Sequence, residues 1–70
     1  MQVSQIAAIA DAAGNIVEPA GIRACYMLNG YQIEETRQPA ANGNVKRTLR
    51  NATTGEVTVE TVSPDQLQPL

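Results

Sequence analysis

The sequence predicts a small, mainly β domain in which two antiparallel hairpins form a sheet or a partial barrel. Two turns predict this fold, because Asn29 and Gly30 lie between runs of high β propensity and Gly55 follows another strand-like run. A short helix or an extended arm precedes the hairpins, so the fold is either all β or α+β. The chain is expected to be one domain with three segments, which are the N-terminal helix or arm at 1–21, the hairpins at 22–62 and a tail at 63–70.

The first twenty residues fit two different structures. Their apolar side chains fall on one helical stripe, with Ser4 placed to cap its start and Gly14 to follow its end. Alanine is the best helix former, which favours the helix, although a helix of about ten residues is marginal on its own. In the alternative, residues 11–15 form a loop that joins an extended segment at 5–10 to another at 16–18. We favour the helix and keep the extended arm as the alternative.

The first hairpin is predicted from Asn29 and Gly30. A two-residue type I′ turn needs positive φ at both positions, which Asn and Gly tolerate best. Such a turn fixes the register of the strands, because side chains alternate between the two faces. The expected pairs are Leu28–Tyr31, Tyr26–Ile33 and Ala24–Glu35 on the core face, and Met27–Gln32, Cys25–Glu34 and Arg23–Thr36 on the opposite face. The opposite face has mixed polarity, so we expect it to meet solvent or a partner.

The second hairpin is predicted over residues 45–51 and 56–62, with Gly55 at the end of the loop. We expect a loop of odd length with a bulge at this glycine, because that parity gathers the apolar side chains on one face. The residues on this expected apolar face are Val45, Leu49, Val57 and Val59.

A loop of four residues is the alternative for the second hairpin. It would put Leu49 beside Thr58 and Arg50 beside Val57, which mixes apolar and polar side chains on both faces. We therefore favour the odd loop. In that register Arg47 interrupts the apolar face, and its guanidinium must reach the rim of the sheet or an acceptor on a partner.

The core of this chain is thin. A domain of 70 residues removes only about 60% of its unfolded surface from water. Phe and Trp are absent, and Tyr26 and Tyr31 are the only aromatic residues. Since Cys25 is the only cysteine and histidine is absent, neither an intrachain disulfide nor the usual zinc ligands are available, and we expect no metal or cofactor. The sequence therefore predicts self-association or binding to a larger protein assembly.

The net charge of −2 gives no strong field that would steer the chain to nucleic acid or to an anionic membrane. The first residues carry no basic side chain, and Asp11 interrupts the alanine-rich stretch that follows them. We therefore expect neither a secretory signal nor a membrane span, and we expect cytoplasmic synthesis without secretion. Four basic residues nevertheless lie close in sequence, namely Arg37, Lys46, Arg47 and Arg50. One alternative function is therefore a small nucleic-acid-binding β-barrel, in which they contact phosphates and a tyrosine stacks on a base.

No pattern of residues predicts an enzyme. Nucleophilic catalysis needs a base beside the nucleophile, yet the chain has no histidine and both serines, Ser4 and Ser63, lie near the termini. We interpret Cys25 as a structural residue. Four glutamates are predicted to be solvated, namely Glu34, Glu35, Glu56 and Glu60.

Two turn segments carry a resemblance to a known class of proteins. Residues 11–17, Asp-Ala-Ala-Gly-Asn-Ile-Val, and residues 52–59, Ala-Thr-Thr-Gly-Glu-Val-Thr-Val, resemble turns of small bacteriophage virion accessory proteins, as does the Gln, Asn and Thr content. Such proteins decorate capsids or join head and tail parts. The resemblance implies several copies bound on a capsid or tail surface, with ordered terminal arms and incorporation into the virion.

The favoured function is a non-enzymatic structural or assembly protein, with a small intracellular inhibitor or regulator of an enzyme as a further alternative. An exposed strand edge can add to the sheet of another chain, and either residues 58–62 or an extended N-terminal segment could do so. The candidate interface residues are Tyr26, Met27, Tyr31, Arg47, Val59, Val62, Leu67 and Leu70.

Overall fold

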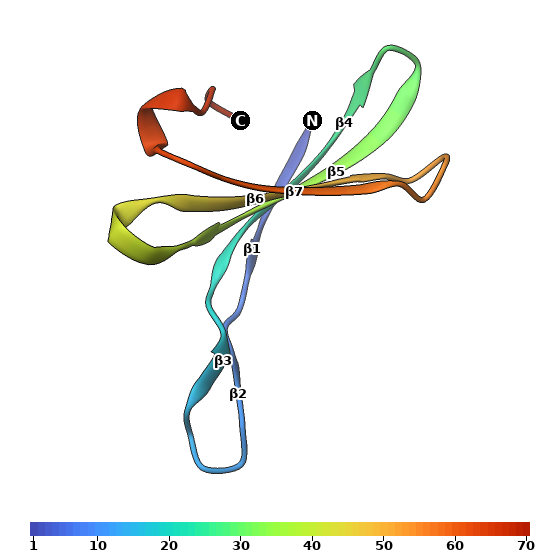
Figure 1. Cartoon of the computed structure of the whole chain (residues 1–70). Helices are drawn as coiled ribbons and strands as arrows, with labels where there is room; N and C mark the ends of the chain where they lie inside the picture. The colour runs from blue at the N-terminus through green and yellow to red at the C-terminus, as the bar shows by residue number, and fades with distance from the viewer.

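The computed structural model describes residues 1–70 and contains one five-stranded antiparallel sheet with a two-stranded arm (Figure 1). The order of strands in the sheet is β1-β4-β5-β6-β7. Their bounds are Gln2–Ile6 for β1, Gly21–Leu28 for β4, Tyr31–Pro39 for β5, Val45–Asn51 for β6 and Val57–Val62 for β7. The arm pairs β2 (Ile9–Ala10) with β3 (Ile16–Glu18), and two short 3₁₀ turns lie at Ala41–Gly43 (η1) and Pro64–Gln66 (η2). Neither helical turn is long and apolar enough to cross a membrane.

The N-terminal segment is extended, so the favoured helix was wrong and the alternative arm is the structure formed. Residues 2–6 pair with β4, and the chain continues beyond them into the arm, which projects away from the sheet (Figure 1). Asp11 closes the tip of the arm, because one of its carboxylate oxygens accepts hydrogen bonds from the backbone N–H groups of Ala13 and Asn15, both at 2.9 Å. A short alanine-rich helix gains little by burying small side chains, whereas the extended segment gains a hydrogen-bonded ladder against β4.

The first hairpin has the predicted turn and register. Asn29 and Gly30 have φ angles of 52° and 83°, as a type I′ turn requires. Leu28 pairs with Tyr31, and every other predicted pair of this hairpin is present between β4 and β5. The local turn chemistry therefore sets the pairing of the two central strands.

The second hairpin has the four-residue loop, so the expected odd loop was wrong. Arg50 pairs with Val57 and Leu49 with Thr58. The loop is held by the Asn51 side-chain oxygen, which accepts the backbone N–H groups of Thr53 at 2.9 Å and Thr54 at 3.0 Å. These bonds fix the loop length, and the resulting register leaves Val57 and Val59 on the opposite side of the sheet from Leu49, whereas Val62 stays on the same side.

The two faces of the sheet differ in burial. We call the inner face the one that carries Ala24 and Glu35, and the outer face the one that carries Cys25 and Glu34. Ala24 and Glu35 are the only fully buried residues in the chain. The sheet is thus a single layer, and only the centre of its inner face is shielded from water.

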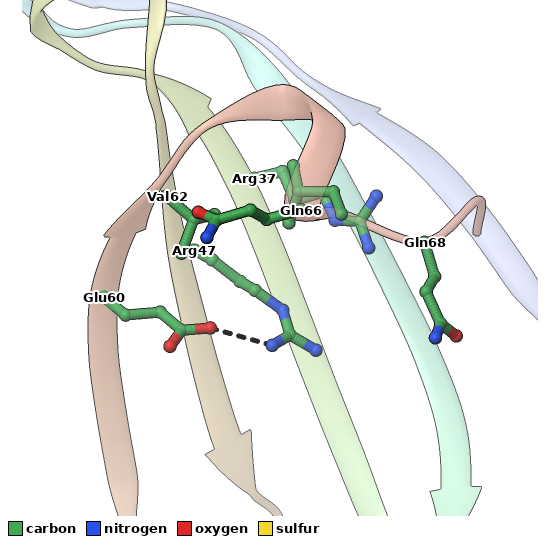
Figure 2. Close-up of a pocket in the computed structure, with 7 residues that line it drawn as sticks. Arg37, Arg47, Glu60, Val62, Gln66 and Gln68 are labelled. Carbon is green, nitrogen blue, oxygen red and sulfur yellow. Dashed lines mark hydrogen bonds and ion pairs between the residues drawn. The ribbon is translucent and has the colours of Figure 1, made fainter.

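The C-terminal tail provides part of that shield. The η2 turn is closed by a capping box in which Gln66 accepts the backbone N–H of Ser63. After this turn the chain runs back over the inner face, where Gln66 and Gln68 lie beside Arg37 and Arg47 (Figure 2). The tail therefore covers the charged centre of the sheet.

Candidate functional site

The most distinctive feature of the inner face is a buried glutamate on its central strand. Glu35 lies on β5, opposite Ala24 of β4 and Leu49 of β6. Only 1% of its surface is exposed. A carboxylate in this position is stable only when hydrogen bonds and opposite charges replace the water that it has lost.

Three side chains donate to the Glu35 carboxylate. The Tyr26 hydroxyl donates to Oε1 at 2.6 Å, and the Nε of Arg37 donates to Oε2. Arg47 donates twice, from Nε to Oε2 at 3.1 Å and from Nη2 to Oε1 at 3.2 Å. Arg47 also donates from Nη1 to Glu60 of β7 at 2.8 Å, the bond drawn in Figure 2. We call these five residues the ionic cluster.

The contacts within the ionic cluster set its protonation. Burial alone raises the pKa of the Glu35 carboxyl, but hydrogen bonds from Arg47, Tyr26 and Arg37 outweigh it and lower this pKa to about 2. Burial, and then the hydrogen bond to Glu35, raises the pKa of the Tyr26 phenol. Hydrogen bonds to Glu35 and Glu60 raise the pKa of Arg47. At neutral pH the cluster therefore holds an ionised carboxylate, a protonated phenol and charged guanidinium groups.

The ionic cluster is better suited to hold the strands together than to exchange protons. Every buried side-chain nitrogen and oxygen has a hydrogen-bond partner. A cleft of about 300 Å³ lies between the cluster and the tail, lined by Arg37, Arg47 and Glu60 (Figure 2). A general base needs a pKa near the working pH, and the Glu35 carboxyl is far below it.

A second group of charges lies on the outer face and is more exposed. Glu34 accepts a hydrogen bond from Arg50 at 2.8 Å, and the guanidinium of Arg23 lies 3.5 Å from its other oxygen. Both arginine side chains are about half exposed to water. Exposed pairs of this kind contribute about 0–1 kcal/mol, so the outer charges matter mainly for the electrostatic character of their face.

The structure divides the predicted interface residues between the two faces. By register Tyr26, Tyr31, Arg47 and Val62 belong to the inner face, whereas Met27 and Val59 belong to the outer face. Leu67 and Leu70 of the tail line clefts over the inner face, the first together with Ile22 and Val45, the second together with Tyr26 and Leu28. The predicted residues therefore do not form one continuous surface.

The four basic residues that are close in sequence do not gather either. Arg37 and Arg47 belong to the ionic cluster on the inner face, and Lys46 and Arg50 lie on the outer face. Three of the four, Arg37, Arg47 and Arg50, form ion pairs with glutamates. The geometry thus gives no single basic strip that could follow a phosphate backbone.

Sequence reasoning missed the centre of the cluster. Glu35 was expected to be solvated, but it is buried, because its pairing with Ala24 places it on the inner face. Arg47 was expected to reach the rim or a partner, yet it finds both of its acceptors, Glu35 and Glu60, within its own chain. One feature of the sequence could have indicated that Glu35 has a charged partner. Arg37 lies two residues after it and hence on the same side of the strand.

The fold and the site together define a single-layer antiparallel β domain with a buried ionic cluster. Comparisons with protein-family models, with curated proteins and with solved structures gave no significant match.

Proposed function

We propose that this chain is a non-enzymatic structural protein that completes its fold by binding another protein surface in an assembly. The observation that carries this proposal is the single layer of the sheet, in which only two of 70 residues are buried. Stable domains pack two or more layers around a core, because a sheet face must be covered by something apolar. A neighbouring chain would supply the missing layer.

The shape of the chain supports the same proposal. Its radius of gyration is 13.2 Å. A compact domain of this length has a radius of about 11 Å. The excess comes from an open sheet and a projecting arm, and the arm exposes the aliphatic side chains of Ile9, Ile16 and Val17. Surfaces of this kind are typical of parts that become covered in an assembly.

Both edges of the sheet could take part. The edge strands are β1 and β7. Natural proteins protect exposed edges with charged residues, prolines or bulges. Strand β1 has no charged residue or proline, and the one charge of β7, Glu60, is engaged by Arg47. Strand addition at either edge is thus compatible with the sequence of both strands.

The test is the mass of the native species, measured for the purified chain and in the extract of cells that produce it. We expect the chain to run in a complex larger than 7.5 kDa, and its thermal unfolding to sharpen on assembly. A free monomer in the extract that unfolds cooperatively above about 65 °C, beyond the usual mesophilic range, would overturn the proposal.

We propose further that the assembly is a bacteriophage virion. The support is the resemblance of two turn segments, which the structure places in the loop and second strand of the arm and in the loop and edge strand of the second hairpin. The experiment is mass spectrometry of purified particles and of the soluble fraction from the same lysate. Enrichment in the particles is the expected result, and recovery in the soluble fraction alone would contradict it.

A further inference from the structure

We propose that two copies of this chain pack inner face against inner face, as the two layers of a β-sandwich. This inference rests on the proposed function and adds to it the partner, a second copy, and the surface that it covers. Two sheets that pack directly on each other lie about 10 Å apart. Because the tail covers the charged centre of the inner face, the direct contact is expected at the end of the sheet near the first hairpin turn. Three observations support the arrangement.

The first observation is the area left exposed. The chain has an accessible surface of 4990 Å². A compact monomer of 7.5 kDa exposes about 4,250 Å². The difference is roughly 700 Å², close to the roughly 800 Å² that each partner buries in a protein interface of standard size. The excess surface of one chain is therefore about what a stable dimer needs.

The second observation is the charge of each face. Four charged side chains of the inner face pair with one another inside the ionic cluster, and a fifth, Glu56, is exposed beside the cleft near the first hairpin turn. A second copy can cover the ionic cluster without leaving an unpaired buried charge, and Glu56 is expected to stay at the solvated rim. The outer face carries three positive side chains and one negative, namely Arg23, Lys46 and Arg50 with Glu34. Two outer faces would repel each other, so the inner face is the one suited to a second copy.

The third observation is a group of apolar side chains on the inner face that the tail covers only in part. At the end of the sheet near the first hairpin turn, Leu28 is 53% exposed and Tyr31 is 45% exposed. Beside them lies a cleft of about 230 Å³ whose lining is half apolar, from Tyr26, Leu28, Ile33 and Leu49, and half polar, from Arg47, Asn51, Glu56 and Thr58. Aromatic and aliphatic side chains at a cleft are the groups that anchor protein interfaces. In the dimer the apolar side of this cleft is expected to be buried, with Glu56 and Thr58 at the rim of the contact.

The proposal is tested by the mass of two variants that differ only in the face they alter. Leu28→Glu puts a charge on the inner face, and the matched control Val59→Glu puts one on the outer face at a residue of similar exposure, 56%. Light scattering after gel filtration should give twice 7.5 kDa for the unaltered chain and for Val59→Glu, and 7.5 kDa for Leu28→Glu. Circular dichroism of each variant checks that the sheet has formed.

A second measurement needs no variant. In a mixture of isotope-labelled and unlabelled chains, nuclear Overhauser effects between copies should involve the methyl groups of Leu28 and Ile33. Effects confined to Val57 and Val59 would overturn the inner-face dimer, as would loss of the dimer in Val59→Glu but not in Leu28→Glu. A chain that stays at 7.5 kDa at every concentration overturns self-association. The proposed function fails separately, if the chain also runs at its monomer mass in the native extract.

Discussion

Arg47 lies directly opposite Arg37 on the neighbouring strand, and the two guanidinium groups share the Glu35 carboxylate. Two like charges at opposed positions of an antiparallel pair destabilise a sheet. Here Glu35 lies one pair along the same face and accepts hydrogen bonds from both arginines, while Glu60 holds the far side of Arg47. The carboxylate therefore turns a repulsive pair into the centre of a cluster that joins β4, β5, β6 and β7.

Removal of the Glu35 charge should destabilise the fold strongly. In Glu35→Gln, Arg37 and Arg47 would face each other without the anion between them. Breaking a buried ion pair by removing one partner costs about 3–5 kcal/mol. Urea unfolding at neutral pH should show a loss of this order. The matched control is Glu34→Gln, the same change at the neighbouring, more exposed residue, where a loss of at most about 1 kcal/mol is expected. Equal losses for the two variants would contradict the central role of Glu35.

The same carboxylate makes stability depend on pH. The pKa of Glu35 is lowered in the folded chain from 4.5 to about 2, so the folded state favours the ionised form. Its contribution to the free energy of unfolding is fully present above pH 4.5 and is lost as the pH falls toward 2. At about 1.4 kcal/mol for each pKa unit, the loss is on the order of 3 kcal/mol. Unfolding measured at several pH values across this range should show the decline, and Glu35→Gln should flatten it. An equally steep decline in Glu35→Gln would assign the effect to other groups.

The first hairpin turn should resist substitution at Gly30. Its φ of 83° lies in the left-handed region, and no atom stands within 4 Å of the place where a Cβ would lie. The cost of Gly30→Val is therefore conformational, and it should exceed about 1 kcal/mol because a β-branched residue tolerates positive φ poorly. Denaturant unfolding measures it. A neutral result would show that the turn relaxes to another type.

Local chemistry explains which parts of the fold could be predicted from sequence. The first hairpin follows from Asn29 and Gly30, because a two-residue turn determines every pair along both strands. The second hairpin depends on Asn51, whose side chain binds two backbone N–H groups of the loop. The alternation of valines favoured an odd loop. The four-residue loop is formed instead, and it places Arg47 opposite Glu60, an ion pair that the valine pattern does not reveal.

Long-range pairing explains what could not be predicted. The N-terminal residues have the composition of a short helix, but β4 offers them an open edge that no local pattern reveals. Burial of Glu35 depends on Arg47, twelve residues further along the chain and on the next strand. Such contacts follow from the register of the sheet. Because the register of the second hairpin was predicted wrongly, the ionic cluster, which depends on Arg47 and Glu60, could not be foreseen.

The junction between the arm and the sheet should not accept a side chain at position 21. A Cβ built on Gly21 would lie 2.3 Å from the backbone oxygen of Arg37 on β5, far inside contact distance. Backbone on a central strand cannot move aside without separating β4 from β5. Gly21→Ala should therefore cost about 1–3 kcal/mol, the usual range for overpacking. Thermal or urea unfolding gives the value, and a loss below about 0.5 kcal/mol would show that the strands shift freely here.

The tip of the arm should open without loss of the sheet when Asp11 is replaced. The Asp11 carboxylate accepts the backbone N–H groups of Asn15 and Ala13, and these bonds lower its pKa. Asp11→Ala removes the acceptor, so amide hydrogen exchange at Ala13 and Asn15 should become faster. Asp11→Asn keeps an oxygen in place and serves as the control, with exchange close to that of the unaltered chain. Because a hairpin of two and three residues contributes little to global stability, the free energy of unfolding should change by at most about 0.5 kcal/mol in both variants. A large global loss in Asp11→Ala would show that the arm is part of the cooperative fold.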